Sequence, residues 1–211
     1  DEIPMEYTRF STIGDLAAAD PAWLKAVLKK QGETLWGFAR GIDLSPVLAS
    51  PAPNKGYGNS TTTPFDVTDR ETADLVLLAL SETLGSRLRA DGAKVSVVSV
   101  GIRYADLSYF SHQRALVSPT DLTLEIYHAA RELFPELWDG RPIRHLGVHT
   151  GGARYGACGR QMSLFDEIDY EKLAVVDRTV DALRQRFGRD SVKRAPFLNT
   201  PVSHMCGGVG A

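Results

Sequence analysis

Two histidines, His145 and His149, stand four residues apart and are the first candidates for metal chemistry. On a helix this spacing would bring both rings to one face, where they could share an ion. The surrounding residues "PIRHLGVHT" alternate apolar and polar, which is typical of a strand, and on a strand these side chains would be about 13 Å apart. We therefore expect no metal site here.

Other residue combinations do not predict a catalytic centre. The stretch "CGGVG" is similar to a phosphate loop, but no helix follows to direct its N-terminus at a phosphate. No Ser, His and Asp set has the sequence context of a nucleophile, and no acidic pair follows an apolar strand as metal-dependent phosphoryl transfer requires. Cys158 and Cys206 lack paired spacing and are predicted to be reduced thiols. We therefore predict no catalytic residue.

The composition is typical of a folded cytoplasmic protein. The chain has 211 residues, of which 43% are hydrophobic and 24% charged, with a net charge of −2. It contains no run of about 18 apolar residues that could span a bilayer, and "DEIPMEYTRF" is not a signal peptide. We expect a monomer without a membrane partner. The near-neutral charge argues mildly against nucleic-acid binding, which usually accompanies a basic excess.

The N-terminal part is predicted to be helical over residues 1–42. Asp20 followed by Pro21 is a helix start, and "TIGDLAAA" and "GETLWGFARGI" give further short helices. Residues 43–57, "DLSPVLASPAPNKGY", contain prolines that prevent a helix and favour an extended tether. This stretch is the best candidate for a domain boundary.

The remainder predicts an α+β domain over residues 58–198, followed by a Gly-rich, flexible tail over residues 199–211. Its expected strands are Asn59 to Pro64, Lys94 to Ala105, Ser108 to Val117 and Pro142 to Thr150. The expected helices are one opened by a Thr68 and Glu71 capping box with an apolar stripe from Ala73 to Leu88, one at 120–134, and one at 170–187. The order strand, helix, strand, strand, helix, strand is the split β-α-β plan of ferredoxin-like folds, with helices on one face of a four-stranded antiparallel-type sheet.

The sheet face opposite the helices is predicted to be open and polar. Val98, Val100 and Ile102 alternate with Ser99, Gly101 and Arg103, and a strand directs alternate side chains to opposite faces. We assign further residues to this open face: Asn59 to Thr63, Ser111, His112, Gln113, Arg114, His145, Gly147 and His149. Short side chains and accessible backbone amides would let phosphate oxygens approach. The alternative is an ordinary solvated surface.

The chain resembles the C-terminal part of the Y-family translesion DNA polymerases, in the Gram-positive branch of the DNA polymerase IV type (impB/mucB/samB family). The resemblance rests on "GNSTTTPFDVTDRETADLVLLALSETLGSRLRADG", "VSVGIRY", "FSHQRAL", "RPIRHLGV", "QMSLFD" and "RFGRDSVKRA", in the family's order. It implies a thumb segment at the N-terminus, then the tether, then the DNA-binding little finger.

The resemblance implies that the little finger holds template-primer duplex DNA by its phosphates, for error-prone synthesis in DNA repair, damage tolerance and the SOS response. The matching DNA-binding positions are Asn59, Ser60, Thr61, Thr62, Arg103, Ser111, His112, Arg114 and His149. His112 and His149 replace residues that are often arginine or lysine in relatives. In the family the palm and thumb share this grip, so a near-neutral little finger can still contribute.

The resemblance gives "QMSLF" a function as well. Gln161, Met162, Leu164 and Phe165 are similar to the peptide by which bacterial polymerases bind the sliding clamp. Such a peptide places apolar side chains in a partner's pocket while glutamine hydrogen-bonds at the rim. The alternative is that Leu164 and Phe165 simply cover the end of the sheet.

The family's catalytic carboxylates, which bind Mg²⁺, belong to palm and finger domains that would precede Asp1. We therefore expect no cofactor in this chain and no polymerase activity from it alone. One alternative is a free-standing protein that occupies the clamp without enzymatic purpose. Another is a ferredoxin-like small-molecule binder or enzyme, which would need polar groups converging on an apolar pocket.

Overall fold

The computed structural model describes residues 10–47, 49–50, 52–161 and 168–207. The chain divides into two compact units, Asp1–Ala52 and Pro53–Ala211. The division falls within the proline-rich stretch that the sequence marks as a tether. The first strand of the second unit begins at Gly56, before the end of that stretch.

The first unit contains the short helices α1 (Ile13–Ala18), α2 (Pro21–Leu28) and α3 (Lys30–Ala39). As predicted, Pro21 is the first residue of α2, and the Asp20 carboxylate accepts a hydrogen bond from the Ala22 amide. The last two helices approach closely at Gly32, where a Cβ would lie 2.2 Å from the Leu24 carbonyl oxygen. Glycine at this position therefore permits the expected small bundle.

The second unit contains β1 (Gly56–Val67), α4 (Arg70–Ala90), β2 (Ala93–Tyr104), β3 (Tyr109–Thr120), α5 (Thr123–Leu137), β4 (Ile143–Gly151), β5 (Arg154–Tyr155), α6 (Tyr170–Phe187) and the 3-10 turns η2 (Arg189–Ser191) and η3 (Ala195–Phe197). The main sheet has the strand order β1-β4-β2-β3, and its paired neighbours are antiparallel. The short β5 pairs with the start of β2. The predicted α+β class and the order of the elements are confirmed.

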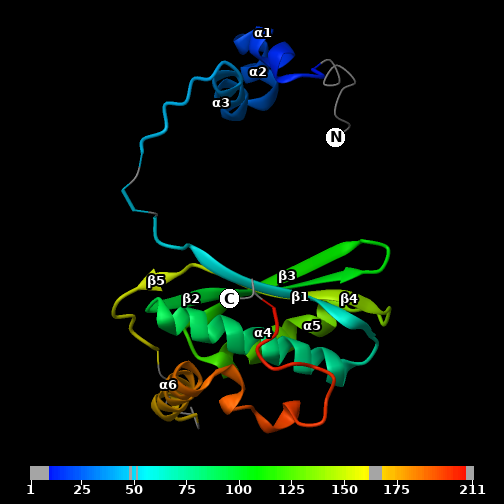
Figure 1. The fold of residues 1–211 in the computed structure, drawn as a ribbon, viewed down its shortest axis with the longest axis vertical. Coiled ribbons are helices and arrows are strands. Elements are labelled where there is room, and N and C mark those ends of the chain that lie inside the picture. Colours follow the sequence, from blue (N-terminus) through cyan, green and yellow to red (C-terminus); the bar gives the residue numbers. More distant parts are fainter. Residues whose placement is uncertain (1–9, 48, 51, 162–167, 208–211) are drawn as a thin grey trace. The chain divides into compact units, whose positions relative to one another are not determined.

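One face of the sheet is covered by α4 and α5, and α6 lies beyond them on the side away from the sheet (Figure 1). The predicted stripe of α4, namely Ala73, Val76, Leu77, Leu80, Leu84 and Leu88, is buried throughout. It meets Val98, Val100 and Ile102 of β2, which are also fully buried. Each such side chain contributes about 1.5 to 3 kcal/mol relative to an exposed one, so this interface is the main core.

The start of α4 differs from the prediction. Asp69, rather than Thr68, is the N-cap, and its carboxylate accepts a hydrogen bond from the Thr72 amide at 2.7 Å. β1 continues to Val67, so the chain turns into the helix one residue later than the Thr68 and Glu71 pattern implies. An aspartate N-cap satisfies a free helix amide as well as threonine would.

The segment after α6 is not a flexible tail over its described length. Val202, His204 and Met205 are buried. The Cys206 carbonyl oxygen accepts hydrogen bonds from Asn59 Nδ2 at 2.9 Å and from Thr83 Oγ1 at 3.3 Å. These contacts attach the C-terminal segment to β1 and α4. None of the described helices combines the length and apolar character needed to cross a membrane.

Candidate nucleic-acid interface

Three neighbouring rows of residues lie on the sheet face left uncovered by α4 and α5, and we call these three rows the open face. From β1 through β4 and β2 to β3, the rows are Gly58, His149, Ser99 and Gln113; Ser60, Gly147, Gly101 and Ser111; and Thr62, His145, Arg103 and Tyr109. None of these residues is acidic. The rows therefore form a polar surface whose only formal charge at neutral pH, with histidines neutral, is that of Arg103.

Glycines at the centre of the open face leave space above the sheet for the rings of neighbouring residues. A Cβ at Gly101 would lie 2.3 Å from the Tyr109 hydroxyl oxygen, and one at Gly58 would lie 2.5 Å from His149 Nδ1. Gly147 lies under the same histidine ring, since its Cβ would be 3.0 Å from Nε2. The two rings thus lie down against the sheet over glycines. A flat surface of this kind lets a large polyanion approach backbone and short side chains together.

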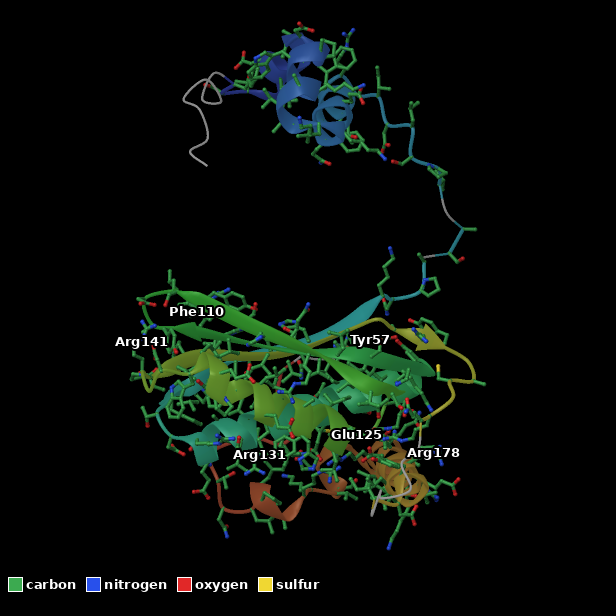
Figure 2. The ribbon with its side chains drawn as sticks, turned by 180° about the vertical axis from the view of Figure 1, so that it is seen from behind. Tyr57, Phe110, Glu125, Arg131, Arg141 and Arg178 are labelled. Carbon is green, nitrogen blue, oxygen red and sulfur yellow. The ribbon has the colours of Figure 1, made fainter. Side chains whose placement is uncertain are left out.

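Arg103 is the cation of the open face. Its guanidinium lies 5.7 Å from the centre of the Tyr109 ring, and among the described residues it has no carboxylate partner. Arg141, at the end of the sheet where Phe110 also lies (Figure 2), is by contrast paired with Asp139 at 2.8 Å and Asp106 at 3.1 Å. Arg103 therefore remains available for an external anion.

His145 is held in its neutral form. Partial burial lowers the pKa of His145, and the positive charges of Arg103 and His149 lower it further. Its Nδ1 lies 3.0 Å from Thr62 Oγ1 on the neighbouring strand. An anion placed over this row would offset the effect of Arg103, so anion binding and protonation of His145 favour each other.

His112 and Arg114 do not lie on the open face, and that assignment is wrong. They stand opposite Val100 and Val98 in the β2–β3 register, which places them on the helix-covered side. Arg114 pairs with Glu132 of α5 at 2.5 Å, and His112 Nδ1 lies 2.9 Å from Glu136. The reason is the two-residue period of the strand, which assigns Ser111 and Gln113 to one face and their neighbours to the other.

Asn59 and Thr61 also belong to the other side of the sheet. Asn59 is only 2% exposed, and its Nδ2 donates to the carbonyl oxygens of Leu80 and Cys206. Thr61 lies on the same side of the strand, because it stands two residues from each of the buried residues Asn59 and Thr63. Of the five β1 residues expected on the open face, Ser60 and Thr62 are the ones that lie there, and Thr63 is 3% exposed on the other side. Asn59 instead satisfies backbone carbonyls within the protein.

Tyr109 is an open-face residue that the sequence interpretation missed. It stands opposite Arg103 and is 48% exposed. A tyrosine at the start of a strand gives no sign of its face until the hairpin register is known. The turn that sets this register contains Leu107 at a φ of 68°.

Gln161, the first residue of the expected clamp peptide, is exposed. Its amide donates to Ser118 Oγ at 3.0 Å. The preceding Arg160 pairs with Glu125 of α5 and lies 3.3 Å from the Tyr170 ring centre. These contacts hold Arg160 and the backbone of Gln161 in place between α5 and α6. Met162, Leu164 and Phe165 lie outside the described residues.

The described part of the chain contains no cluster of three or more His, Cys, Asp or Glu side chains that could hold a metal ion. His145 and His149 occupy different rows of the open face.

Comparison with known proteins is consistent with this geometry. The DNA polymerase IV of Acetivibrio thermocellus is 39% identical over 191 residues, which cover 89% of this chain and 48% of that protein. The DNA polymerase IV of Clostridium acetobutylicum is 36% identical, with 89% and 47% covered. DNA polymerase IV 2 of Bacillus subtilis is 38% identical, with 89% and 46% covered. The chain thus spans about half the length of these curated relatives.

The family match centres on the sheet. The impB/mucB/samB family C-terminal domain matches residues 54–164. This range contains all the strands, together with α4 and α5, and so includes the whole open face. The resemblance found in the sequence is confirmed, and the chain belongs to the impB/mucB/samB family, whose C-terminal domain it contains.

Proposed function

We propose that this chain is the DNA-binding and clamp-binding C-terminal region of an error-prone translesion DNA polymerase that acts in the cytoplasm in DNA repair and damage tolerance. The open face carries the proposal. It combines two histidines and several hydroxyl groups with an arginine that has no carboxylate partner among the described residues, on a flat surface whose own residues include no carboxylate. Duplex DNA presents phosphate oxygens over a broad surface, which matches these donors.

The net charge of −2 does not oppose this function, because charge is distributed unevenly over the domain. Glu132 and Glu136 of α5 lie on the helix side, where Glu132 pairs with Arg114 and Glu136 lies 2.9 Å from His112 Nδ1. Arg103 on the open face has no such partner among the described residues. The proposed phosphate contacts are Ser60, Thr62, Arg103, Ser111 and His149, with Tyr109, Gln113 and His145 beside them.

Phosphate contact suits synthesis across damage. Such contacts fix the position of the duplex but carry no direct base readout, so damaged and undamaged templates are held alike. In the proposed polymerase the catalytic carboxylates and Mg²⁺ would be provided by the palm. The role of this chain would be to hold the primed template in place.

The DNA-binding part is tested by titrating the chain against fluorescent duplexes of two unrelated sequences at several salt concentrations. We expect equal affinity for both sequences and a linear fall of log affinity with log salt, as counterion release predicts. A clear preference for one sequence, or no binding at low salt, would contradict the proposed interface.

The clamp-binding part rests on the sequence of Gln161, Met162, Leu164 and Phe165 and on the anchored position of Arg160. It is tested with a bacterial sliding clamp, the chain and a Leu164→Ala, Phe165→Ala double variant. We expect micromolar binding that the folded variant loses. If the clamp binds neither protein, "QMSLF" has a packing role and the DNA-binding proposal stands alone.

A further inference from the structure

Helix α6 buries charged side chains and exposes apolar ones, which is the reverse of a usual amphipathic surface helix. The residues that it buries are charged, namely Asp177 and Arg184. Its apolar residues Val176, Leu183 and Phe187 are 45%, 37% and 62% exposed. A surface helix normally directs apolar side chains toward the core and charged ones toward water. The arrangement of α6 therefore leaves apolar side chains that the described residues of its own unit do not cover.

Ion pairs fix the rotation of α6 about its axis. Arg89 of α4 pairs with Asp177 at 3.0 Å and with Asp181 at 2.6 Å. One turn further along, Arg184 pairs with the buried Glu82 at 3.2 Å. These contacts lie at intervals of three and four residues along one face of α6. Because they are buried and specific, they hold the apolar residues on the neighbouring face rather than under α4.

The outward residues have the spacing of a helix-pairing seam. Leu173, Val176, Val180, Leu183 and Phe187 follow one another at alternating intervals of three and four residues. None of the five is buried, and Leu173 and Val180 are partly exposed. This is the a/d repeat by which one helix packs along another. We call these residues the α6 stripe.

The edge of the α6 stripe is basic. Lys172, Thr179 and Arg186 are three or four residues from Val176 and Leu183, and so lie along the outer side of the stripe. The Arg186 guanidinium lies 5.0 Å from the Phe187 ring centre, directly beside the stripe. Asp177 and Asp181 lie away from this edge because they face Arg89, and the remaining acidic residue of α6, Glu171, lies in its first turn.

We propose that the α6 stripe docks an amphipathic helix of another protein whose own apolar seam is flanked by acidic residues. The heptad spacing of the stripe favours a helix as the partner, and its basic edge favours a partner with acidic residues beside the apolar seam. A second copy of this chain would bring two basic edges together, which disfavours self-pairing. The docking surface lies after the family domain, which ends at residue 164, and is separate from the open face.

The test uses two synthetic peptides of three heptads, both with leucine at the a and d positions. One carries glutamate at e and g, and the other carries lysine. Calorimetric titration of the full chain should show micromolar binding of the glutamate peptide and at least about tenfold weaker binding of the lysine peptide. Equal binding of both peptides, or binding of neither, would overturn the proposal.

Variants assign the binding to the stripe. Leu183→Ser with Phe187→Ser should weaken binding of the glutamate peptide at least about tenfold while the melting curve stays cooperative. Val175→Ser is the matched control, because Val175 is 54% exposed on α6 but lies off the stripe. It should leave the affinity unchanged, and equal losses in both variants would count against the assignment.

Two further measurements exclude other occupants. Sedimentation velocity should show a monomer, and the chain should not bind vesicles containing anionic phospholipid. Self-association that Leu183→Ser and Phe187→Ser abolish would identify the stripe as a contact between copies. Vesicle binding without peptide binding would identify it as a membrane contact. Either result would overturn the proposed acidic helix.

Discussion

Arg103 and Arg114 lie on one β-hairpin but project from opposite faces of its sheet. Arg103 stands opposite Tyr109 on the open face, whereas Arg114 stands opposite Val98 on the helix side. Arg114 is neutralised by Glu132, while Arg103 has no carboxylate partner in the described part of the chain. Of these two arginines, Arg103 is therefore the one whose charge is available to a phosphate group.

The first prediction concerns Asn59, whose side chain is a structural group rather than a DNA contact. Asn59→Ala removes hydrogen bonds to the carbonyl oxygens of Leu80 and Cys206, and the Cys206 carbonyl keeps the longer bond from Thr83 Oγ1 at 3.3 Å. The free energy of unfolding should fall by about 1 to 3 kcal/mol, as measured by urea denaturation. Ser60→Ala, on the open face, is the matched control and should change stability little. A stability loss as large in Ser60→Ala would contradict this division of roles.

The second prediction concerns pH and His145. Its pKa lies below the ordinary histidine value because of burial and because of Arg103 and His149, so the free protein keeps it neutral at neutral pH. Phosphate raises that pKa in the complex, so the complex binds more protons than the free protein and affinity rises as pH falls from 7.5 toward 5.5. Anisotropy titrations across this range should show a shallower rise for His145→Gln. An identical rise in both proteins would remove His145 from the interface.

The effect of His145 on folding stability has the opposite pH dependence, because stability falls as pH falls. Because the folded-state pKa of His145 is lowered, the unfolded chain takes up a proton first as pH falls through the ordinary histidine value. The contribution of His145 to stability is therefore present above that value and decreases below it. The DNA titrations should be made where urea denaturation shows the protein to be fully folded.

The third prediction concerns Cys206 and the docking of the C-terminal segment. Burial raises the pKa of Cys206 to about 11, well above the ordinary thiol value. At pH 8 its thiolate fraction, and hence its rate with a disulfide reagent, should be on the order of a hundredfold below that of a free thiol. A Cys158→Ser variant isolates this reaction. Adding Asn59→Ala should accelerate it, because Asn59 holds the Cys206 carbonyl. Fast labelling without that substitution would show that the segment is not docked.

The layered architecture could be predicted from the sequence because its signals are local. Alternation of Val98, Val100 and Ile102 with polar residues assigned the faces of β2, and the apolar stripe of α4 identified its buried side. Strands and helices fell in the expected order. The spacing of apolar residues along a strand or helix predicts directly which of its sides is buried.

The faces of β3 could not be predicted in the same way. The residues from Tyr109 to Ala115 are exposed on both sides of this edge strand, so no apolar period marks one side as buried. His112 and Arg114 reach the helix side because the hairpin register places them there. Asn59 was misplaced for a different reason, because a buried asparagine is stabilised by backbone carbonyls from distant parts of the chain.

The most direct test of the central claim is duplex-DNA binding by Arg103→Ala beside Arg114→Ala, measured by anisotropy over a range of salt concentrations. We predict that Arg103→Ala weakens binding and lowers the slope of log affinity against log salt by about one, because one phosphate contact is lost. Arg114→Ala should retain the affinity and slope of the unmodified chain. Equal losses in both variants, or a loss in Arg114→Ala alone, would contradict the assignment of DNA binding to the open face.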